Sequence, residues 1–275
     1  MVSKAKELDQ FYTDPTYAKS FYNQIESAID LSQADILLEP SAGTGSYYNL
    51  MDPVRRQGFD LDPQAPGIIH QDFLEWYPDS VPVPRIVTIG NPPFGKSARL
   101  AIQFFNHAAT FSTHIAFTIP RTFRKASVIN RLHQNFHLIH DETVPDNSFL
   151  YEEKPYDVWC CSQIWERRPI RREPIQILHL KDFTEYFEIV EPKNADFAIQ
   201  RVGGRAGQIR TQAFQGYSPE SHYFIRAHHP LTLEIFSECD FETMKYNTVG
   251  NPSISPSELL QEWQTIFLKK DEKKT

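Results

Sequence analysis

Residues 35–45 read DILLEPSAGTG, a short apolar run that ends in a glycine-containing turn. An uninterrupted apolar run closed by such a turn is typical of a strand buried on both faces of a parallel sheet. Gly43 and Gly45 lack a Cβ atom, so the backbone after this strand leaves room for a ligand to approach. A glycine pair after a strand is a weak signal by itself, and a plain turn explains it equally well.

The same kind of apolar run recurs along the first half of the chain. Further strands are predicted over 57–63, 67–73, 85–90 and 113–119, and helical spacing predicts helices over 17–28 and 97–109. Asp14 or Thr13 is expected to cap the first of these helices, with Pro15 in its first turn. Strands that alternate with helices predict an α/β fold, a Rossmann-like, doubly wound, mostly parallel sheet of seven strands. Ligands of such sheets bind at the carboxyl ends of the strands.

The second half of the chain has a different character. A further strand is expected over 156–165, so the main domain is placed at 1–168 and a small C-terminal extension, packed on it, at 169–275. A last helix is predicted over 257–268, with the charged end 269–275 frayed. Four arginines lie at this boundary, and they are expected either to contact phosphates or to solubilise a linker. They are Arg167, Arg168, Arg171 and Arg172.

Composition limits the class of protein. Three cysteines without paired spacing argue for a reducing compartment and against a zinc site, and no His/Cys set has ligand spacing, so no metal is expected. The first residues carry no apolar run typical of a signal peptide, and no apolar stretch approaches the length that spans a bilayer. We therefore expect a cytoplasmic protein that does not contact membranes.

The net charge of −7 is unusual for a protein that binds nucleic acid. The acidic excess lies mainly in residues 1–90, which hold 13 acidic and 6 basic side chains. The rest of the chain is close to neutral, so the charge argues against nucleic acid only for the first part of the chain.

Asn91-Pro92-Pro93-Phe94 directly follows the strand predicted over 85–90, about fifty residues after the glycine turn. An amide oxygen and a proline-preceding carbonyl can both accept the N–H bonds of a planar amine, which frees the nitrogen lone pair. The prolines fix φ and remove competing donors, and Phe94 offers a face for a flat base. A purely structural turn is the alternative. In this order the two motifs indicate methyl transfer from S-adenosylmethionine to a planar nitrogen.

Acidic residues follow the second and third predicted strands. Asp60 can accept both ribose hydroxyls of an adenosine group, although Asp62 competes for this role and either residue suits an ordinary turn. Asp72 can accept from the adenine amine of the cofactor while Phe73 packs on the ring, or it can simply cap the next turn.

Two further groups are candidates for contact with the substrate. Phe149 lies after a loop at the expected substrate face, where its ring could sandwich a base against Phe94, and burial in the core is the alternative. Arg201, Arg205 and Arg210 are interspersed with glycines, which suits a flexible loop that contacts phosphates. A solvated hairpin explains the arginines equally well.

Residues 8–165 resemble the amino-type N6-adenine methyltransferases that depend on S-adenosylmethionine and carry the cofactor motif first and target recognition last. The resemblance implies that a segment like Phe11–Pro15 touches the methionine part of the cofactor, through Tyr12 and Thr13. It further implies that 119–123 corresponds to the end of the fifth strand and that Asn91, Pro92, Pro93 and Phe94 are catalytic. The implied contacts of the cofactor loop and the carboxylates are Glu39, Pro40, Ser41, Ala42, Gly43, Gly45, Asp60, Asp72 and Phe73.

The function implied is methylation of the exocyclic N6 of adenine in nucleic acid, with DNA slightly favoured over RNA, by base flipping and direct in-line transfer. The extension would then help to recognise the substrate, and a homodimer or an accessory subunit would assist binding. One alternative is a protein glutamine N5-methyltransferase, although those enzymes usually carry Tyr in place of Phe94 and an N-terminal helical domain. Another is a catalytically silent subunit that binds nucleic acid.

Overall fold

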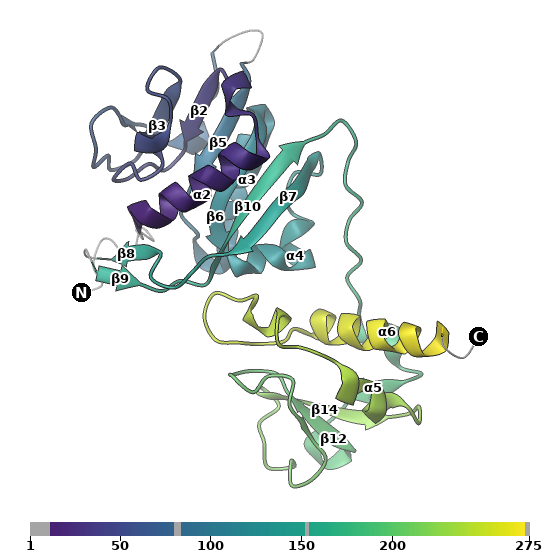
Figure 1. Cartoon of the computed structure of the whole chain (residues 1–275). Helices are drawn as coiled ribbons and strands as arrows, with labels where there is room; N and C mark the ends of the chain where they lie inside the picture. Colours follow the sequence, from purple (N-terminus) through teal and green to yellow (C-terminus); the bar gives the residue numbers. More distant parts are fainter. Residues whose placement is uncertain (1–11, 80–83, 152–153, 273–275) are drawn as a thin grey trace. The chain divides into compact units, whose positions relative to one another are not determined.

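The computed structural model describes residues 12–79, 84–151 and 154–272. The chain divides after Ile175 into two compact units, which are described separately below (Figure 1).

Among the described residues, the first unit is built on a seven-stranded sheet with the order β4-β3-β2-β5-β6-β10-β7. Neighbouring strands from β4 to β6 are parallel, and β10 runs antiparallel to both β6 and β7. This Rossmann-like topology confirms the predicted fold class. The strands are β2 (Ile36–Glu39), β3 (Arg56–Asp60), β4 (Ile69–His70), β5 (Ile86–Gly90), β6 (Ser112–Pro120), β7 (Phe136–Thr143) and β10 (Cys160–Arg167).

Helices cover both faces of this sheet because successive strand residues point to opposite sides. Leu37 and Val87 belong to the hydrophobic cluster of α2 (Pro15–Ala28), whereas Leu38 belongs to the cluster of α3 (Arg99–Phe111). The predicted cap of α2 is confirmed, since the Asp14 side chain accepts from the backbone N–H groups of Thr16 and Tyr17. A short helix, α4 (Ala126–Ile129), follows β6.

The helical layer is thinner than the sequence predicts on the β3 side of the sheet. Only a 3₁₀ turn, η2 (Tyr48–Leu50), lies between β2 and β3, and another, η3 (Phe73–Glu75), follows β4. The connection from β2 to β3 contains two glycines with positive φ and two prolines, which oppose a regular helix.

The strand predicted over 156–165 is two strands in the structure. In the described part of the chain, β9 (Lys154–Tyr156) joins β8 (Phe149–Tyr151) and β1 (Tyr12–Thr13) in a separate three-stranded sheet, and β10 begins only at Cys160. Between them the Asp157 carboxylate accepts from the backbone N–H of Asn147 at 2.6 Å, which turns the chain out of a single strand.

Two of the four boundary arginines, Arg167 and Arg172, are structural anchors, which neither predicted role anticipated. Arg168 pairs with Glu166 at the surface, and Arg171 is exposed. Arg167 donates through Nε to the Ser112 carbonyl, and Arg172 donates to the carbonyls of Phe136, Ile129 and Leu132. Burial lowers the pKa of both guanidinium groups. Residues 169–175, which the sequence assigned to the extension, therefore belong to the first unit.

The second unit is an antiparallel sheet with helices α5 (Thr232–Glu238) and α6 (Pro256–Glu272). Its described strands have the order β11-β14-β12-β13, and Phe187, Phe236 and Trp263 form the centre of its core. The prediction that the chain is frayed from residue 269 is wrong up to Glu272, where α6 ends. Lys270 holds this last turn by pairing with Glu234 and Glu238 of α5. The strands are β11 (Phe187–Ile189), β12 (Phe197–Gln200), β13 (Ile209–Arg210) and β14 (His222–Ala227).

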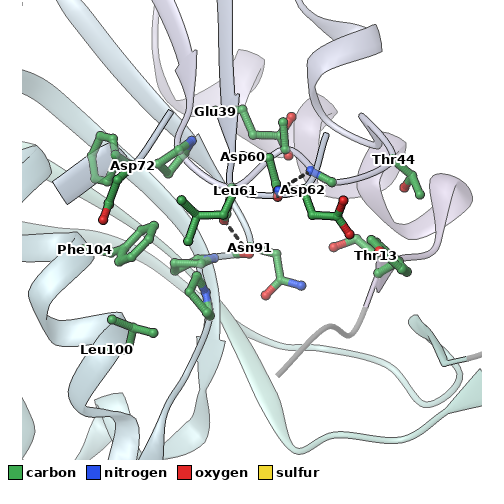
Figure 2. A pocket seen from close by; sticks show the side chains of 18 of the residues that line it. Thr13, Glu39, Thr44, Asp60, Leu61, Asp62, Asp72, Asn91, Leu100 and Phe104 are labelled. Atoms are coloured by element: carbon green, nitrogen blue, oxygen red, sulfur yellow. Dashed lines mark hydrogen bonds between the residues drawn. The ribbon is translucent and has the colours of Figure 1, made fainter. Parts of the chain in front are cut away.

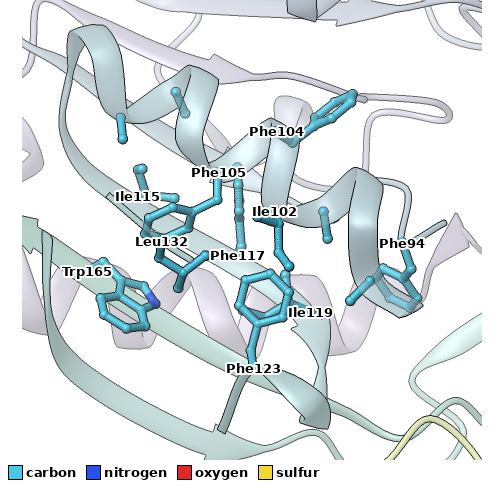
Figure 3. Packing of buried hydrophobic residues seen from close by; sticks show 14 of the residues in the cluster. Phe94, Ile102, Phe104, Phe105, Ile115, Phe117, Ile119, Phe123, Leu132 and Trp165 are labelled. Carbon is cyan, nitrogen blue, oxygen red and sulfur yellow. The ribbon is translucent and has the colours of Figure 1, made fainter. Parts of the chain in front are cut away.

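Replacement of Phe105 should destabilise the first unit strongly. Its ring is fully buried and makes edge-to-face contacts with Phe136 and Trp165, with centroids 5.7 and 5.4 Å away (Figure 3). Phe105→Ala should lower the free energy of unfolding by about 3–5 kcal/mol in urea denaturation, because it leaves a cavity. Val54→Ala, at an exposed apolar position, should change it by less than about 0.5 kcal/mol. Equal effects would contradict the core assignment.

Candidate functional site

A cavity of about 380 Å³ opens at the carboxyl ends of β2, β3 and β5 (Figure 2). It brings together most of the residues singled out from the sequence, although these lie up to eighty positions apart. The predicted residues that line it are Tyr12, Thr13, Glu39, Pro40, Ser41, Ala42, Gly43, Asp60, Asp72, Phe73, Asn91, Pro92, Pro93 and Phe94.

The turn after β2 depends on two glycines for its backbone conformation. Gly43 and Gly45 have φ values of +46° and +82°, in the region that favours glycine. A Cβ at Gly43 would lie 2.9 Å from the Tyr12 ring, so Tyr12 closes over the turn. Gly45 does not line the cavity and instead shapes the turn, with its N–H donating to the Ala42 carbonyl. Phe11, at the start of the predicted cofactor segment, lies outside the described residues.

Asp60 joins the ends of β3 and β2. One carboxylate oxygen accepts from the Gly43 N–H at 2.7 Å, and the other accepts from the Asp62 N–H at 2.8 Å. These two bonds fix the plane of the carboxylate beside the cavity, and each oxygen keeps further acceptor capacity. Asp62 lines the cavity as well, so the structure keeps both carboxylates in range of a ligand.

Glu39 is a buried acid at the end of β2. Its Oε2 accepts from the Tyr48 N–H at 2.6 Å, which ties β2 to the η2 turn. Burial, and to a smaller extent the charge of Asp60, hold the pKa of the Glu39 carboxyl well above its usual range, against the opposing effect of the Tyr48 bond. The carboxyl is therefore biased toward its neutral form.

Asp72 and Phe73 form the wall of the cavity that follows β4. Asp72 caps η3 by accepting from the Leu74 N–H at 2.8 Å, and no residue of the described ranges donates to its second oxygen. Phe73 is almost fully buried, with its ring 5.2 Å from that of Phe104. The wall therefore offers a carboxylate oxygen beside an apolar surface.

The Asn91 turn stands next to the glycine turn. The Ser41 hydroxyl donates to the Asn91 carbonyl at 3.0 Å, a bond that links the two motifs directly (Figure 2). Phe94 borders the cavity, but only 7% of its surface is exposed and most of its ring packs in the core, so it offers less of a face than the sequence suggested. Its carbonyl accepts from Leu100 and Ala101 at the start of α3.

The remaining predicted substrate residues are Phe149 and three arginines. Phe149 is 1% exposed and packs in the core near Tyr17, so the alternative of burial holds and its ring cannot sandwich a base here. The three arginines belong to the second unit, and their contact with phosphates stays a prediction. Arg201 lies over the Tyr223 ring and Arg210 over the Tyr217 ring, while Arg205 is exposed in a turn.

Several lining residues were not foreseen. Leu100 and Phe104 come from α3, where helical spacing indicated only a core face, and Leu61 and Leu74 follow residues that were recognised. Gln71 precedes the predicted Asp72, and its side-chain amide donates to the Asp72 carbonyl. The set missed by the sequence reasoning is Thr44, Ser46, Leu61, Gln71, Leu74, Leu100 and Phe104.

Two general features concern the whole described part of the chain. No group of three or more His, Cys, Asp or Glu side chains is arranged there to hold a metal ion. None of its helices has the combination of length and apolar character needed to cross a bilayer.

Comparison with known proteins gives structural likenesses only. No protein-family model and no curated protein sequence matches the chain. Among solved structures, a candidate RNA methyltransferase from Pyrococcus horikoshii is 15% identical, with 60% of this chain and 90% of that chain covered and a TM-score of 0.47.

Two other solved structures are similar over a comparable share of the chain. A candidate class I S-adenosylmethionine-dependent methyltransferase from Listeria monocytogenes is 15% identical, over 60% of this chain and 63% of that chain, with a TM-score of 0.44. The 23S rRNA methyltransferase ErmE is 15% identical, over 61% and 72%, with a TM-score of 0.38. Scores this low carry no argument about activity, which we base on the site.

Replacement of the buried acid should change how stability depends on pH. Because the pKa of Glu39 is raised in the native state, that state keeps a proton which the unfolded chain loses above about pH 4.3. The free energy of unfolding therefore falls as pH rises from there through the native pKa. Glu39→Gln removes this loss of stability. The free energy of unfolding of the variant, minus that of the parent protein, should therefore increase from pH 5 to pH 8 in urea denaturation without ligand.

The control is Glu75→Gln, at an exposed carboxyl of the neighbouring η3 turn. The effect of removing the buried acid should depend on pH more strongly than the effect of removing this exposed one. A Glu39→Gln difference that does not grow with pH would contradict the neutral, buried state of this acid.

Proposed function

We propose that this protein is an S-adenosylmethionine-dependent methyltransferase that methylates the exocyclic N6 of adenine in nucleic acid. The observation that carries the proposal is that the glycine turn with its paired Asp60 and the Asn91 turn border one cavity and are hydrogen-bonded to each other through Ser41. One motif suits an adenosine-containing cofactor, and the other suits a planar amine.

The residues of the cavity fit the cofactor. Asp60 has acceptor oxygens for the two ribose hydroxyls, and Asp72 has one for an adenine amine, with Phe73 as the apolar wall for the ring. Gly43 and the Tyr12 ring packed on it line the cavity where the part of the ligand that follows the ribose would lie. When bound, S-adenosylmethionine supplies an electrophilic methyl group.

The acceptor amine is held by the Asn91 turn. The Asn91 carbonyl already accepts from Ser41, so we assign the two bonds from the amine to the Asn91 side-chain oxygen and to the Pro92 carbonyl, which precedes Pro93. Two acceptors draw the amine out of conjugation with the ring and stabilise the positive charge that develops on it. Orientation and hydrogen bonding then supply the catalysis.

The same two acceptors also suit the side-chain amide of a protein glutamine. A tritiated-methyl transfer assay with DNA, RNA and protein in parallel distinguishes the nucleic-acid enzyme from the glutamine enzyme. A protein that binds the cofactor and transfers no methyl group to any of them would be the silent subunit.

Removal of the Asn91 side chain should abolish transfer and leave cofactor binding intact. Asn91→Ala should lower kcat by at least roughly 100-fold, because one of the two oriented acceptors is lost. Its Kd for the cofactor, measured by isothermal titration calorimetry, should stay close to that of the parent protein. Asp60→Asn should show the opposite pattern, with weaker cofactor binding. A fully active Asn91→Ala protein would refute the catalytic assignment.

Loss of the Ser41 hydroxyl should affect catalysis more than binding. Ser41→Ala releases the Asn91 carbonyl, so the acceptors become less well oriented and kcat should fall roughly 10- to 100-fold. Ser46→Ala is the matched comparison, since its hydroxyl donates from the same loop to the Thr13 carbonyl at 2.7 Å. Equal losses of kcat in the two variants would indicate general loosening of the loop instead.

A further inference from the structure

Arg121 and Trp159 form a cross-strand pair at the rim of the sheet that carries Asn91. The Arg121 N–H donates to the Trp159 carbonyl at 3.0 Å, which continues the β6–β10 ladder one pair beyond Pro120 and Cys160. Directly paired residues place their side chains on the same face of a sheet. Since β6 lies next to β5, which delivers Asn91, this pair stands beside the catalytic turn along the same rim.

The Arg121 guanidinium is held from two directions. It lies over the Trp159 ring at 5.8 Å from the centroid, and its Nε donates to the Cys160 carbonyl at 3.2 Å. The cation–π contact and this bond restrain the group, while its terminal nitrogens make no hydrogen bond with any described residue. A guanidinium held in this way is pre-organised to bind an anion with its outer edge.

The charge of Arg121 is the second feature of this group. Within the described ranges no carboxylate forms an ion pair with it, whereas Arg124, three residues on, is paired with Asp141. Arg167 and Arg172 use their donors on backbone carbonyls. Arg121 is therefore a positive charge with open donors, and it lies beyond residues 1–90, where the acidic excess of the chain is found.

We propose that Arg121, held by Trp159, binds a backbone phosphate of the nucleic-acid strand next to the target nucleotide. The proposal rests on the proposed function, which makes nucleic acid the substrate. A planar fork of N–H donors matches the oxygens of a phosphate and binds two of them at once. The contact fixes the position of the strand and carries no base specificity.

The test is the affinity for labelled single-stranded 12-nucleotide DNA and RNA, measured by fluorescence anisotropy over a range of salt concentrations. Arg121→Ala should weaken binding of both roughly tenfold and reduce the slope of log affinity against log salt by about 0.7, the value for one phosphate contact on a single strand. Arg121→Lys, which keeps the charge and loses the fork, should fall between the parent protein and Arg121→Ala.

Arg171→Ala is the matched control. Arg171 is exposed and follows the carboxyl end of β10, which runs antiparallel and so ends at the opposite rim from Asn91. It removes the same charge, and its affinity and salt slope should match those of the parent protein. Equal effects of Arg121→Ala and Arg171→Ala would overturn the proposal, as would a parent protein that binds neither strand.

Cofactor binding and methyl transfer are measured separately on the same variants. A parent protein that binds S-adenosylmethionine and methylates nucleic acid, but whose oligonucleotide affinity does not depend on Arg121, would refute only the phosphate contact. A parent protein that binds oligonucleotides through Arg121 without transferring a methyl group would refute only the catalytic proposal.

Discussion

The parallel pairing of β2 with β5 is the constraint on which the site depends. Ile36, Leu37 and Leu38 lie opposite Ile86, Val87 and Thr88, so the two strands end side by side. Gly90 at the end of β5 packs so closely that a Cβ there would lie 3.3 Å from Glu39 and Pro40. Two motifs fifty residues apart in sequence thereby become neighbours, and the Ser41–Asn91 bond is a direct result.

The elements that the sequence predicts well are those whose pattern is local. The buried run before Glu39, the capped helix that starts after Asp14 and the strand that delivers Asn91 each follow from spacing and capping within a few residues. The position of the site follows in turn, because the carboxyl ends of neighbouring parallel strands lie together.

What the sequence could not supply depends on contacts between distant segments. The break of the strand predicted over 156–165 follows from the bond between Asp157 and Asn147. The anchoring of Arg172 depends on three carbonyls between the end of α4 and the start of β7. Burial of Phe149 likewise depends on its place opposite Thr13 in a small sheet that no local pattern indicates. Phe104 faces the cavity because of how α3 packs, and helical spacing alone does not distinguish a core face from a cavity wall.

The anchored segment 169–175 has a consequence for dissecting the molecule. Asn130 exchanges two hydrogen bonds with Ile175, and Arg172 lies over the Trp165 ring at 5.7 Å. A shortened chain that ended with β10 would lose these bonds and would leave the carbonyls that accept from Arg172 without this donor. A fragment of the first unit intended for crystallisation or spectroscopy should therefore extend through Ile175.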